Sequence, residues 1–310
     1  MIAWLFPGQG AQAVGMGQAL YETSAAAREV FERADDALGW SVSKVCFEGP
    51  ASELMRTPIT QPALLTVSTA VLAAIREAVP DLPEPTFAAG HSLGEYSALV
   101  ATGAIRLEDA VRLVHLRGKA MQEAVPEGQG SMAAILAPDD VVWQLCEDAA
   151  QGDVLTPANF NAPGQVVIAG HFAAVERALD LADERQLRAM PLKVSAPFHC
   201  SLMSPAAAVM QDALSRTAVR APAVPVVSNV EARPNADPAR VPDLLVRQVD
   251  GPVLWSQSVQ WLVEQGVTRA IEIGSGKVLA GLLKRIDKRI SVLGVGDPAG
   301  VARVEEFLAT

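Results

Sequence analysis

The sequence has few of the features that mark specialised folds or locations. It holds only 3 cysteines, Cys46, Cys146 and Cys200, and none of them forms a CxxC pair. This set argues against a disulfide framework or a zinc site and fits a reducing, cytoplasmic compartment. No apolar run is long enough to span a membrane as a helix. The first residues, MIAWLF, are too short for the apolar core of a secretory signal and lack its basic start.

Positive charge is also scarce. The chain carries 25 Lys and Arg against 35 Asp and Glu, which gives a formal net charge of −10. Such a chain is repelled by nucleic-acid phosphates and by anionic membranes, so we expect neither as a partner. Aromatic residues make up 5% of the chain, but 50% of it is hydrophobic. A chain of 310 residues can therefore bury a sizeable core, in one large domain or one domain with an insertion.

The segment 86–105, TFAAGHSLGEYSALVATGAI, is the strongest functional signal. It begins as an apolar strand, makes a tight turn and continues as a helix. Gly90-x-Ser92-x-Gly94 at that turn is the nucleophile-elbow pattern, in which the glycines let strand and helix approach closely. Ser92 would then lie at a helix N-terminus, where backbone N–H groups favour developing negative charge. The segment predicts a serine nucleophile.

A serine hydroxyl needs a base, and 4 histidines are available. His91 follows the strand end and should point away from Ser92. His115 lies in a predicted helix among apolar residues, as core histidines do, and His171 begins a helix near the middle of the chain. His199 lies in an irregular segment where two parts of the chain meet, a usual place for catalytic residues. We favour His199, and a backbone carbonyl could orient its ring because no acid stands out for that role.

Other parts of such a site follow from the same pattern. The backbone N–H of Leu93, directly after the serine, would be one oxyanion donor. The Pro-Gly-Gln-Gly loop at 7–10 is the best source of the second. Arg117 lies on a predicted helix, where an arginine is usually solvated. Cys200 has the character of a small buried residue, because the elbow already supplies a nucleophile.

Alternating strands and helices predict a mostly parallel sheet for most of the chain. Its expected strands are 2–6, the run before Gly90, 224–229, 269–274 and 291–296. Its expected helices are 18–39, 51–57, 63–78, the run after Ser92, 107–123, 204–216, 242–250, 256–266 and 278–289. Residues 130–195 instead follow the order strand, helix, strand, strand, helix, strand of the ferredoxin-like module. We expect a catalytic domain formed by 1–126 and 197–310, with an insert at 127–196.

Eight segments in order resemble the malonyl-CoA:acyl carrier protein transacylases of fatty-acid synthesis. They are FPGQGAQ (6–12), TQPALL (60–65), GHSLGEYSALVATGAI (90–105), LVHLRGKAM (113–121), NFNAPGQVVIAG (159–170), VSAPFHCSLMSPA (194–206), LVRQVDGPVLWSQSV (245–259) and IEIGSGKVLAGLLKRI (271–286). The resemblance covers nearly the whole chain. It implies an α/β-hydrolase-like large domain with an inserted ferredoxin-like α+β domain.

The resemblance also implies an activity. Ser92 would take malonyl from malonyl-CoA and pass it to the phosphopantetheine thiol of acyl carrier protein, in a ping-pong reaction without metal or other cofactor. His199 corresponds to the family's base, and Gln248 to the residue whose backbone carbonyl orients it. Gln9 and Leu93 correspond to the oxyanion donors. A monomer in the cytoplasm is expected.

Two further residues correspond to substrate contacts of the family. Arg117 corresponds to the arginine that holds the malonyl carboxylate. Phe198 precedes the histidine, as in related polyketide acyltransferase domains that select malonyl over methylmalonyl, where a large ring would crowd a C2 methyl group.

Four alternatives stay open on the sequence. The chain could be a free-standing acyltransferase that loads polyketide synthase carriers, a transacylase subunit of a malonate decarboxylase, a hydrolase with the same elbow, or a scaffold without activity. A hydrolase would have little use for a buried arginine facing the acyl chain. An acidic carrier would need a local basic surface. The candidates are Lys284, Arg285, Lys288 and Arg289, or else Arg185, Arg188 and Lys193.

Overall fold

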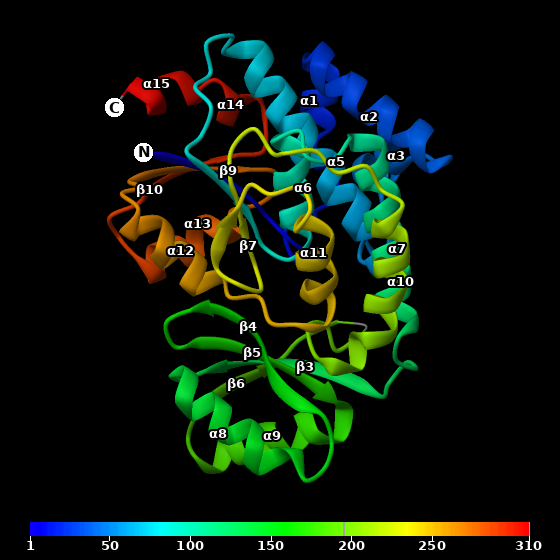
Figure 1. Cartoon of the computed structure of the whole chain (residues 1–310), viewed down its shortest axis with the longest axis vertical. Coiled ribbons are helices and arrows are strands. Elements are labelled where there is room, and N and C mark those ends of the chain that lie inside the picture. The colour runs from blue at the N-terminus through cyan, green and yellow to red at the C-terminus, as the bar shows by residue number, and fades with distance from the viewer. Residues whose placement is uncertain (195, 310) are drawn as a thin grey trace.

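The computed structural model describes residues 1–194 and 196–309. Its chain forms a large part around a 6-stranded sheet and a smaller part around a 4-stranded sheet. Figure 1 shows the small sheet and its two helices, α8 and α9, at one end of the molecule, away from the helices α1 and α2.

The large sheet has the strand order β10-β9-β1-β2-β7-β8. Its strands are β1 (Ile2–Phe6), β2 (Phe87–Gly90), β7 (Val226–Ser228), β8 (Arg233–Asn235), β9 (Arg269–Ile273) and β10 (Ser291–Val295). All neighbouring pairs are parallel except β7 and β8. Parallel strands with helices on both faces confirm the α/β class, and the short antiparallel edge strand β8 was not expected.

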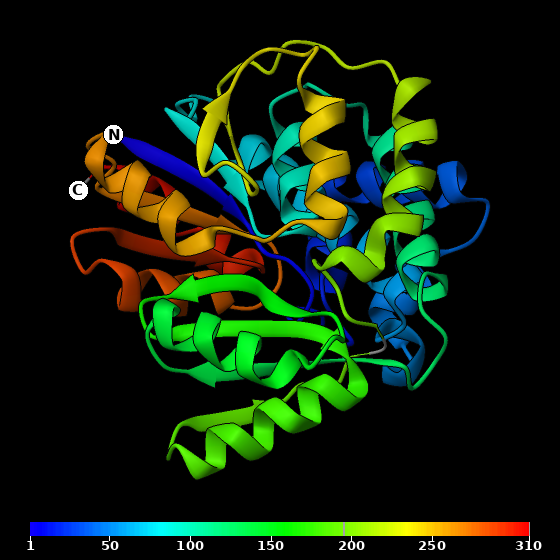
Figure 2. The same ribbon diagram turned by 60° about the horizontal axis from the view of Figure 1, so that its bottom comes forward.

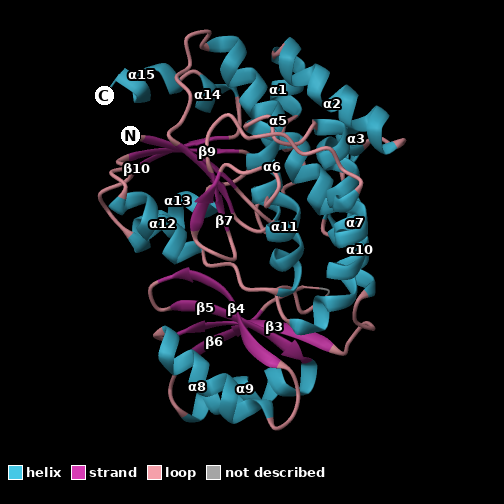
Figure 3. Ribbon diagram, in the orientation of Figure 1, coloured by secondary structure: helices cyan, strands magenta, loops and turns pink. Residues whose placement is uncertain are grey.

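Helices cover both faces of this sheet, as Figure 3 shows. Along β1, Ala3 and Leu5 pack with one helix layer, whereas Trp4 and Phe6 pack with the other, which is the period of two that a strand requires. The first layer contains α12 (Trp255–Glu264) and α13 (Val278–Ile286). The other helices of the large part are α1 (Gln18–Thr23), α2 (Ala25–Leu38), α3 (Val42–Glu48), α4 (Ala51–Leu54), α5 (Thr57–Ala78), α6 (Leu93–Ala101), α7 (Leu107–Glu123), α10 (Ser204–Ser215), α11 (Val241–Asp250), α14 (Pro298–Val301) and α15 (Val304–Ala309), with a 3-10 turn at Ser201–Met203.

The long helix α5 lies in the core and contains a proline. Pro62 has no N–H, so the carbonyl of Pro58 loses its usual partner four residues on. His115 of α7 approaches that carbonyl instead, with Nδ1 2.8 Å from the Pro58 oxygen. Contrary to the expectation from the sequence, this helix is long and apolar enough to cross a membrane, but 78% of its most apolar window is buried inside the protein. Its composition is that of a core helix.

The small part has the strand order β4-β5-β3-β6, with every pair antiparallel. Its elements are β3 (Gly130–Leu136), α8 (Asp139–Ala150), β4 (Leu155–Ala162), β5 (Gln165–His171), α9 (Phe172–Glu184) and β6 (Arg188–Pro191). This order and connectivity are those expected of a ferredoxin-like module. One face of its sheet packs on α8 and α9, and the other packs against the large core.

The edge strand β4 joins the small part to the large one. The N–H of Phe160 donates to the Val253 carbonyl at 2.9 Å, and the Val253 N–H donates to the Ala158 carbonyl at 2.9 Å. Figure 2 shows the green strands of the small part beside the orange helices α12 and α13, and β4 is in contact with both helices. The small sheet lies within the predicted insert 127–196, whose boundaries stay a prediction. Ser195 of the predicted insert and Thr310 of the predicted catalytic domain lie outside the described residues.

Several element boundaries differ from those predicted. The helix expected at 18–39 is two helices, because Ser24 is extended and caps α2 through its side chain. The helix expected at 63–78 begins at Thr57, and the piece expected at 51–57 ends at Leu54. The last strand of the module expected at 130–195 ends at Pro191, and helix α13 ends at Ile286 rather than 289.

Candidate active site

Ser92 lies in the turn between β2 and α6. Its backbone has φ 50° and ψ −108°, a strained conformation for a residue with a Cβ atom. The chain packs so closely here that a Cβ on Gly90 would lie 1.9 Å from the Gly94 carbonyl carbon. One on Gly94 would lie 2.1 Å from the Phe6 oxygen. Only glycine fits at these two positions, which is why the turn has this spacing.

The serine hydroxyl is in direct contact with a histidine. Ser92 Oγ lies 2.7 Å from His199 Nε2, and His199 Nδ1 lies 2.8 Å from the backbone oxygen of Gln248. Because a carbonyl can only accept, Nδ1 carries the ring proton, and Nε2 is free to accept from the serine. Among the four histidines, the contacts of the described residues place only His199 against the serine hydroxyl.

The surroundings keep this histidine neutral. Burial and the nearby Arg117 cation lower the pKa of His199 to about 3. At neutral pH its ring is therefore uncharged, which is the form that can accept a proton. Burial raises the pKa of the neighbouring Cys200 thiol to about 11, and its Sγ lies 3.1 Å from the Pro197 oxygen. Cys200 thus stays protonated and unreactive.

Arg117 points from α7 to the same serine. It is 1% exposed, and its NH1 donates to Gln61 Oε1 at 2.8 Å. Its NH2 donates to Gln248 Oε1 at 2.9 Å and to Ser92 Oγ at 3.2 Å. Its Nε has no hydrogen-bond partner among the described residues. A buried cation with only neutral acceptors is energetically costly and suited to binding an anion. The general expectation of a solvated helix arginine is wrong here.

Three polar residues that the sequence did not single out support this arrangement. Asn229 follows β7, accepts from the Ser92 N–H at 2.6 Å and donates to the Gly90 oxygen at 2.7 Å. Glu95 Oε2 accepts from the Asn229 N–H at 3.0 Å and from Gln248 Nε2 at 2.8 Å. Burial raises the pKa of Glu95 to about 7. The third is Gln61, which holds Arg117.

The two expected oxyanion donors face the same region. Gln9 follows β1 and lines the cavity that contains Ser92, and Leu93 begins α6. No hydrogen bond within the described residues uses the backbone N–H of Gln9 or of Leu93. Both groups are therefore available to a substrate oxygen.

The remaining histidines have structural partners. His91 Nε2 lies 2.8 Å from Asn161 Oδ1, and its ring lines the cavity rather than contacting the serine hydroxyl. His171 Nδ1 accepts from the Val154 N–H at 3.0 Å, and His115 Nδ1 contacts the Pro58 carbonyl oxygen of α5.

The cavity around Ser92 has a volume of about 170 Å³. Both parts of the chain line it, since Met132, Asn159 and Val167 come from the small sheet, and Phe198 and Arg117 come from the large part. Within the described residues, no group of three or more His, Cys, Asp or Glu side chains is positioned to hold a metal ion. The cavity has room for a short acyl group with a carboxylate end, but not for a whole coenzyme thioester.

Residues 3–292 match the family model described as an acyl transferase domain. The chain is 47% identical over 307 residues to the malonyl CoA-acyl carrier protein transacylase of Escherichia coli K12, covering 98% of this chain and 99% of that protein. The acyl-carrier-protein S-malonyltransferase of Burkholderia pseudomallei 1710b is 48% identical, with a TM-score of 0.95 and coverage of 98% and 99%. A malonyl-transacylase solved in complex with its type II PKS acyl-carrier protein is 44% identical, with a TM-score of 0.95 and coverage of 98% and 99%.

Proposed function

This chain belongs to the acyl transferase family, and we propose that it transfers malonyl from malonyl-CoA to acyl carrier protein through a malonyl ester on Ser92. The observation that carries the proposal is the buried Arg117, which donates to the same oxygen that contacts His199. The nucleophile, its base and a cation for a carboxylate thus meet at one atom. Nothing in this chemistry calls for a metal or other cofactor.

In the first half-reaction, His199 Nε2 takes the Ser92 proton as Oγ attacks the thioester carbonyl. The N–H groups of Gln9 and Leu93 would donate to the oxyanion. The C–S bond then breaks, and His199 returns its proton to the departing coenzyme A thiolate. Ser92 is left as the malonyl ester, and the ring is neutral again.

The second half-reaction runs the same steps with another thiol. His199 takes the proton of the carrier's phosphopantetheine thiol, whose sulfur attacks the ester carbonyl. Collapse of the tetrahedral intermediate breaks the bond to Oγ, and His199 returns the proton to Ser92. The hydrogen bond from His199 Nδ1 to the Gln248 carbonyl supports both steps, because it fixes the ring and its tautomer.

The acyl group is selected by two side chains. A guanidinium can hold a carboxylate through two parallel charge-assisted hydrogen bonds, so Arg117 would bind the far end of malonyl. Phe198 is 8% exposed and lines the cavity. Its ring would restrict the space beside C2, which favours malonyl over methylmalonyl.

A carrier of polyketide synthesis is the second candidate partner. The malonyl-transacylase found with a type II PKS acyl-carrier protein is 44% identical to this chain. The chemistry at Ser92 would be the same, and only the docked carrier would differ. Purified carriers of both kinds, offered with labelled malonyl-CoA, separate the two by the rate at which each is loaded.

Acylation of Ser92 can be measured by intact-mass analysis after mixing with malonyl-CoA. We expect one malonyl adduct, absent in Ser92→Ala and retained in Ser97→Ala. The latter removes a buried hydroxyl of the same helix that has no hydrogen-bond partner among the described residues. His199→Ala should slow acylation by about 10² to 10⁴, the usual contribution of a general base. An adduct that persists in Ser92→Ala, or a normal rate in His199→Ala, would contradict the proposal.

A further inference from the structure

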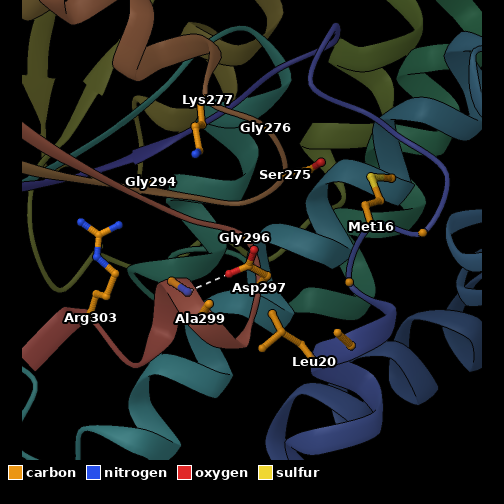
Figure 4. Close-up of a pocket in the computed structure, with 14 residues that line it drawn as sticks. Met16, Leu20, Ser275, Gly276, Lys277, Gly294, Gly296, Asp297, Ala299 and Arg303 are labelled. Atoms are coloured by element: carbon orange, nitrogen blue, oxygen red, sulfur yellow. Dashed lines mark hydrogen bonds between the residues drawn. The ribbon is translucent and has the colours of Figure 1, made fainter.

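A second cavity, of about 580 Å³, lies beside the loop that follows β1. Figure 4 shows the residues that line it. They come from three segments, which are the end of that loop with the start of α1, the turn after β9, and the turn after β10 with α14. All three follow the carboxyl ends of parallel strands, where α/β sheets bind ligands. Its volume is in the range of small-molecule sites.

Glycines keep this space open. The turn after β9 reads Gly-Ser-Gly-Lys, and Gly276 has φ 80°. The turns after β9 and β10 meet backbone to backbone, because a Cβ on Gly296 would lie 2.7 Å from the Gly274 oxygen. Gly294, Gly300 and Gly15 also line the cavity. Backbone groups rather than side chains therefore face a ligand there.

The turn after β9 contains backbone N–H groups that have no acceptor among the described residues. Within the described residues, no hydrogen bond uses the backbone N–H of Ser275, Gly276 or Lys277. Ser275 is only 9% exposed, lines the cavity, and its hydroxyl has no partner among the described residues. Successive free N–H groups in a turn form a site for an anion.

The first N–H groups of α13 do not contribute to this site. Those of Leu279 and Ala280 donate to the buried carboxylate of Glu272 at 2.9 Å and 2.8 Å. The donors that face the cavity are thus the turn and its side chains.

Two cations flank the cavity. Lys277 and Arg303 have no ion pair or side-chain hydrogen bond among the described residues, and Figure 4 shows them extending on either side of Gly294. Asp297 is the acid of the lining, and its Oδ1 accepts from the Gly300 N–H at 2.7 Å. The lining residues carry a net positive charge within a chain whose net charge is −10.

We propose that this cavity binds a phosphate-bearing ligand, with the phosphoryl group against the turn 275–277 and the side chains of Lys277 and Arg303. The source of the phosphate is either the nucleotide end of coenzyme A or a separate phosphorylated molecule. The first source rests on the proposed function. Met16 and Leu20 give the opposite side of the cavity an apolar surface that suits a base or alkyl group.

One loop, the loop that follows β1, contributes residues both to this second cavity and to the cavity at Ser92. The loop that begins at Pro7 carries Gln9 toward Ser92 and then Gly15 and Met16 to this cavity. A ligand in the cavity would therefore contact the same loop that supplies an oxyanion donor. The cavity at Ser92 is too small for a whole coenzyme thioester, so the nucleotide end must lie elsewhere on the surface.

The test is calorimetric titration of the full chain with adenosine 3′,5′-bisphosphate and with inorganic phosphate at low salt, where surface charges are least screened. We expect binding that weakens about tenfold or more in Lys277→Gln and in Arg303→Gln, the usual effect of losing a charged hydrogen bond. Ser275→Ala removes the free hydroxyl and should weaken binding by less. Lys44→Gln and Arg220→Gln, which remove exposed cations elsewhere, should leave it unchanged.

Kinetics then separate the two sources. If coenzyme A fills the site, the same variants raise the KM for malonyl-CoA and leave malonyl-pantetheine, which lacks the nucleotide, unchanged. If a separate molecule fills it, the bisphosphate binds without competing with malonyl-CoA. Equal affinity in the variants and the controls, or no binding up to about 10 mM, overturns the proposal. Acylation of Ser92 is measured independently, so failure here leaves the proposed function standing.

Discussion

In the proposed reaction, Arg117 would act in two ways at once. Its charge would bind the malonyl carboxylate, and together with burial it lowers the pKa of His199. A bound carboxylate would offset that charge, so His199 becomes a stronger base when malonyl is present. Acetyl brings no carboxylate and leaves the histidine a weak base. Selection by Arg117 therefore has a binding component and a chemical one.

Arg117→Ala should depress malonyl transfer by roughly 30- to 4000-fold, because losing the partner of a buried charge costs about 2–5 kcal/mol. Acetyl transfer should hold or rise, since no unpaired cation then faces a methyl group or lowers the pKa of His199. Arg117→Lys should fall between, because an ammonium cannot form two parallel hydrogen bonds. The measurement is the ratio of kcat/KM for malonyl-CoA to that for acetyl-CoA.

Arg112→Ala on the exposed side of the same helix is the matched control, and its ratio should equal that of the unmodified chain. A constant ratio across all the Arg117 variants would remove Arg117 from substrate selection.

Glu95 should make stability depend on pH. Burial raises its pKa to about 7 from an ordinary 4.5. The folded chain then binds more protons at this group than the unfolded chain between those values, so its contribution is lost as pH rises through 7. Glu95→Gln does not titrate. The stability of the unmodified chain relative to Glu95→Gln should therefore fall by roughly 2–3 kcal/mol between pH 5 and pH 8.

Urea unfolding at the two pH values measures this difference. Glu32→Gln, at an exposed acid, should track the unmodified chain at both pH values. A gap between Glu95→Gln and the unmodified chain that does not change with pH would mean that Glu95 is charged throughout this range.

At the level of elements, the close packing of β1, β2 and α6 is what presents Ser92. Gly94→Ala would put a Cβ 2.1 Å from the Phe6 oxygen, and overpacking of this kind typically costs about 1–3 kcal/mol or more. Gly281→Ala is the opposite case, since a Cβ at that helix position meets nothing within 4 Å. It should stabilise the chain by about 0.4–1 kcal/mol by restricting the unfolded state.

Thermal or urea unfolding of these two variants gives the comparison. Equal stability of Gly94→Ala and the unmodified chain would show that the elbow can open to accept a side chain.

The sequence predicted elements best where one periodicity runs unbroken. Helix α7 has the predicted bounds, 107–123. The prediction failed at Ser24, whose hydroxyl accepts from the Ala27 N–H and starts a new helix inside an apolar pattern. It also failed at Pro62, because the partner that replaces the lost N–H is His115, far along the chain. Such a contact cannot be found in a local window.

The candidate site also depends on contacts between residues that lie far apart in the sequence. Ser92 was found from a local motif, and His199 from its place at a junction between the two parts of the chain. Glu95 was visible as an acid in an otherwise apolar helix, yet its partners Asn229 and Gln248 lie 134 and 153 residues away. The proposed role of Arg117 came from family resemblance alone, because nothing on its own helix indicates that the cation is buried.

At the level of the whole molecule, the net charge of −10 opposes an acidic carrier, so docking needs unpaired cations. In the first predicted cluster, Arg285 donates to Gln165 Oε1 at 2.6 Å and Arg289 pairs with Asp287. Lys284 and Lys288 have no ion pair among the described residues. In the second predicted cluster, Arg185 pairs with Asp148, whereas Arg188 and Lys193 have no ion pair among the described residues.

The double variant Lys284→Glu/Lys288→Glu should raise the KM for carrier about tenfold or more at low salt and leave acylation by malonyl-CoA unchanged. Lys44→Glu/Lys119→Glu makes the same change in net charge on exposed sites elsewhere and serves as the control. If only Arg188→Glu/Lys193→Glu raises the KM, the carrier docks on the small part. No change in either double variant would contradict docking through these cations.

The cavity at Ser92, at about 170 Å³, cannot hold two thiol arms together, and in the proposed reaction one histidine serves both. Each half-reaction exchanges a thioester for the same serine ester, so the chemistry at Ser92 favours neither direction of transfer. The chain is thus an equilibrator of two pools, one on coenzyme A and one on carrier. The net direction of malonyl transfer is set by which of the two thioesters other enzymes consume. A shortage of free carrier would return malonyl to coenzyme A.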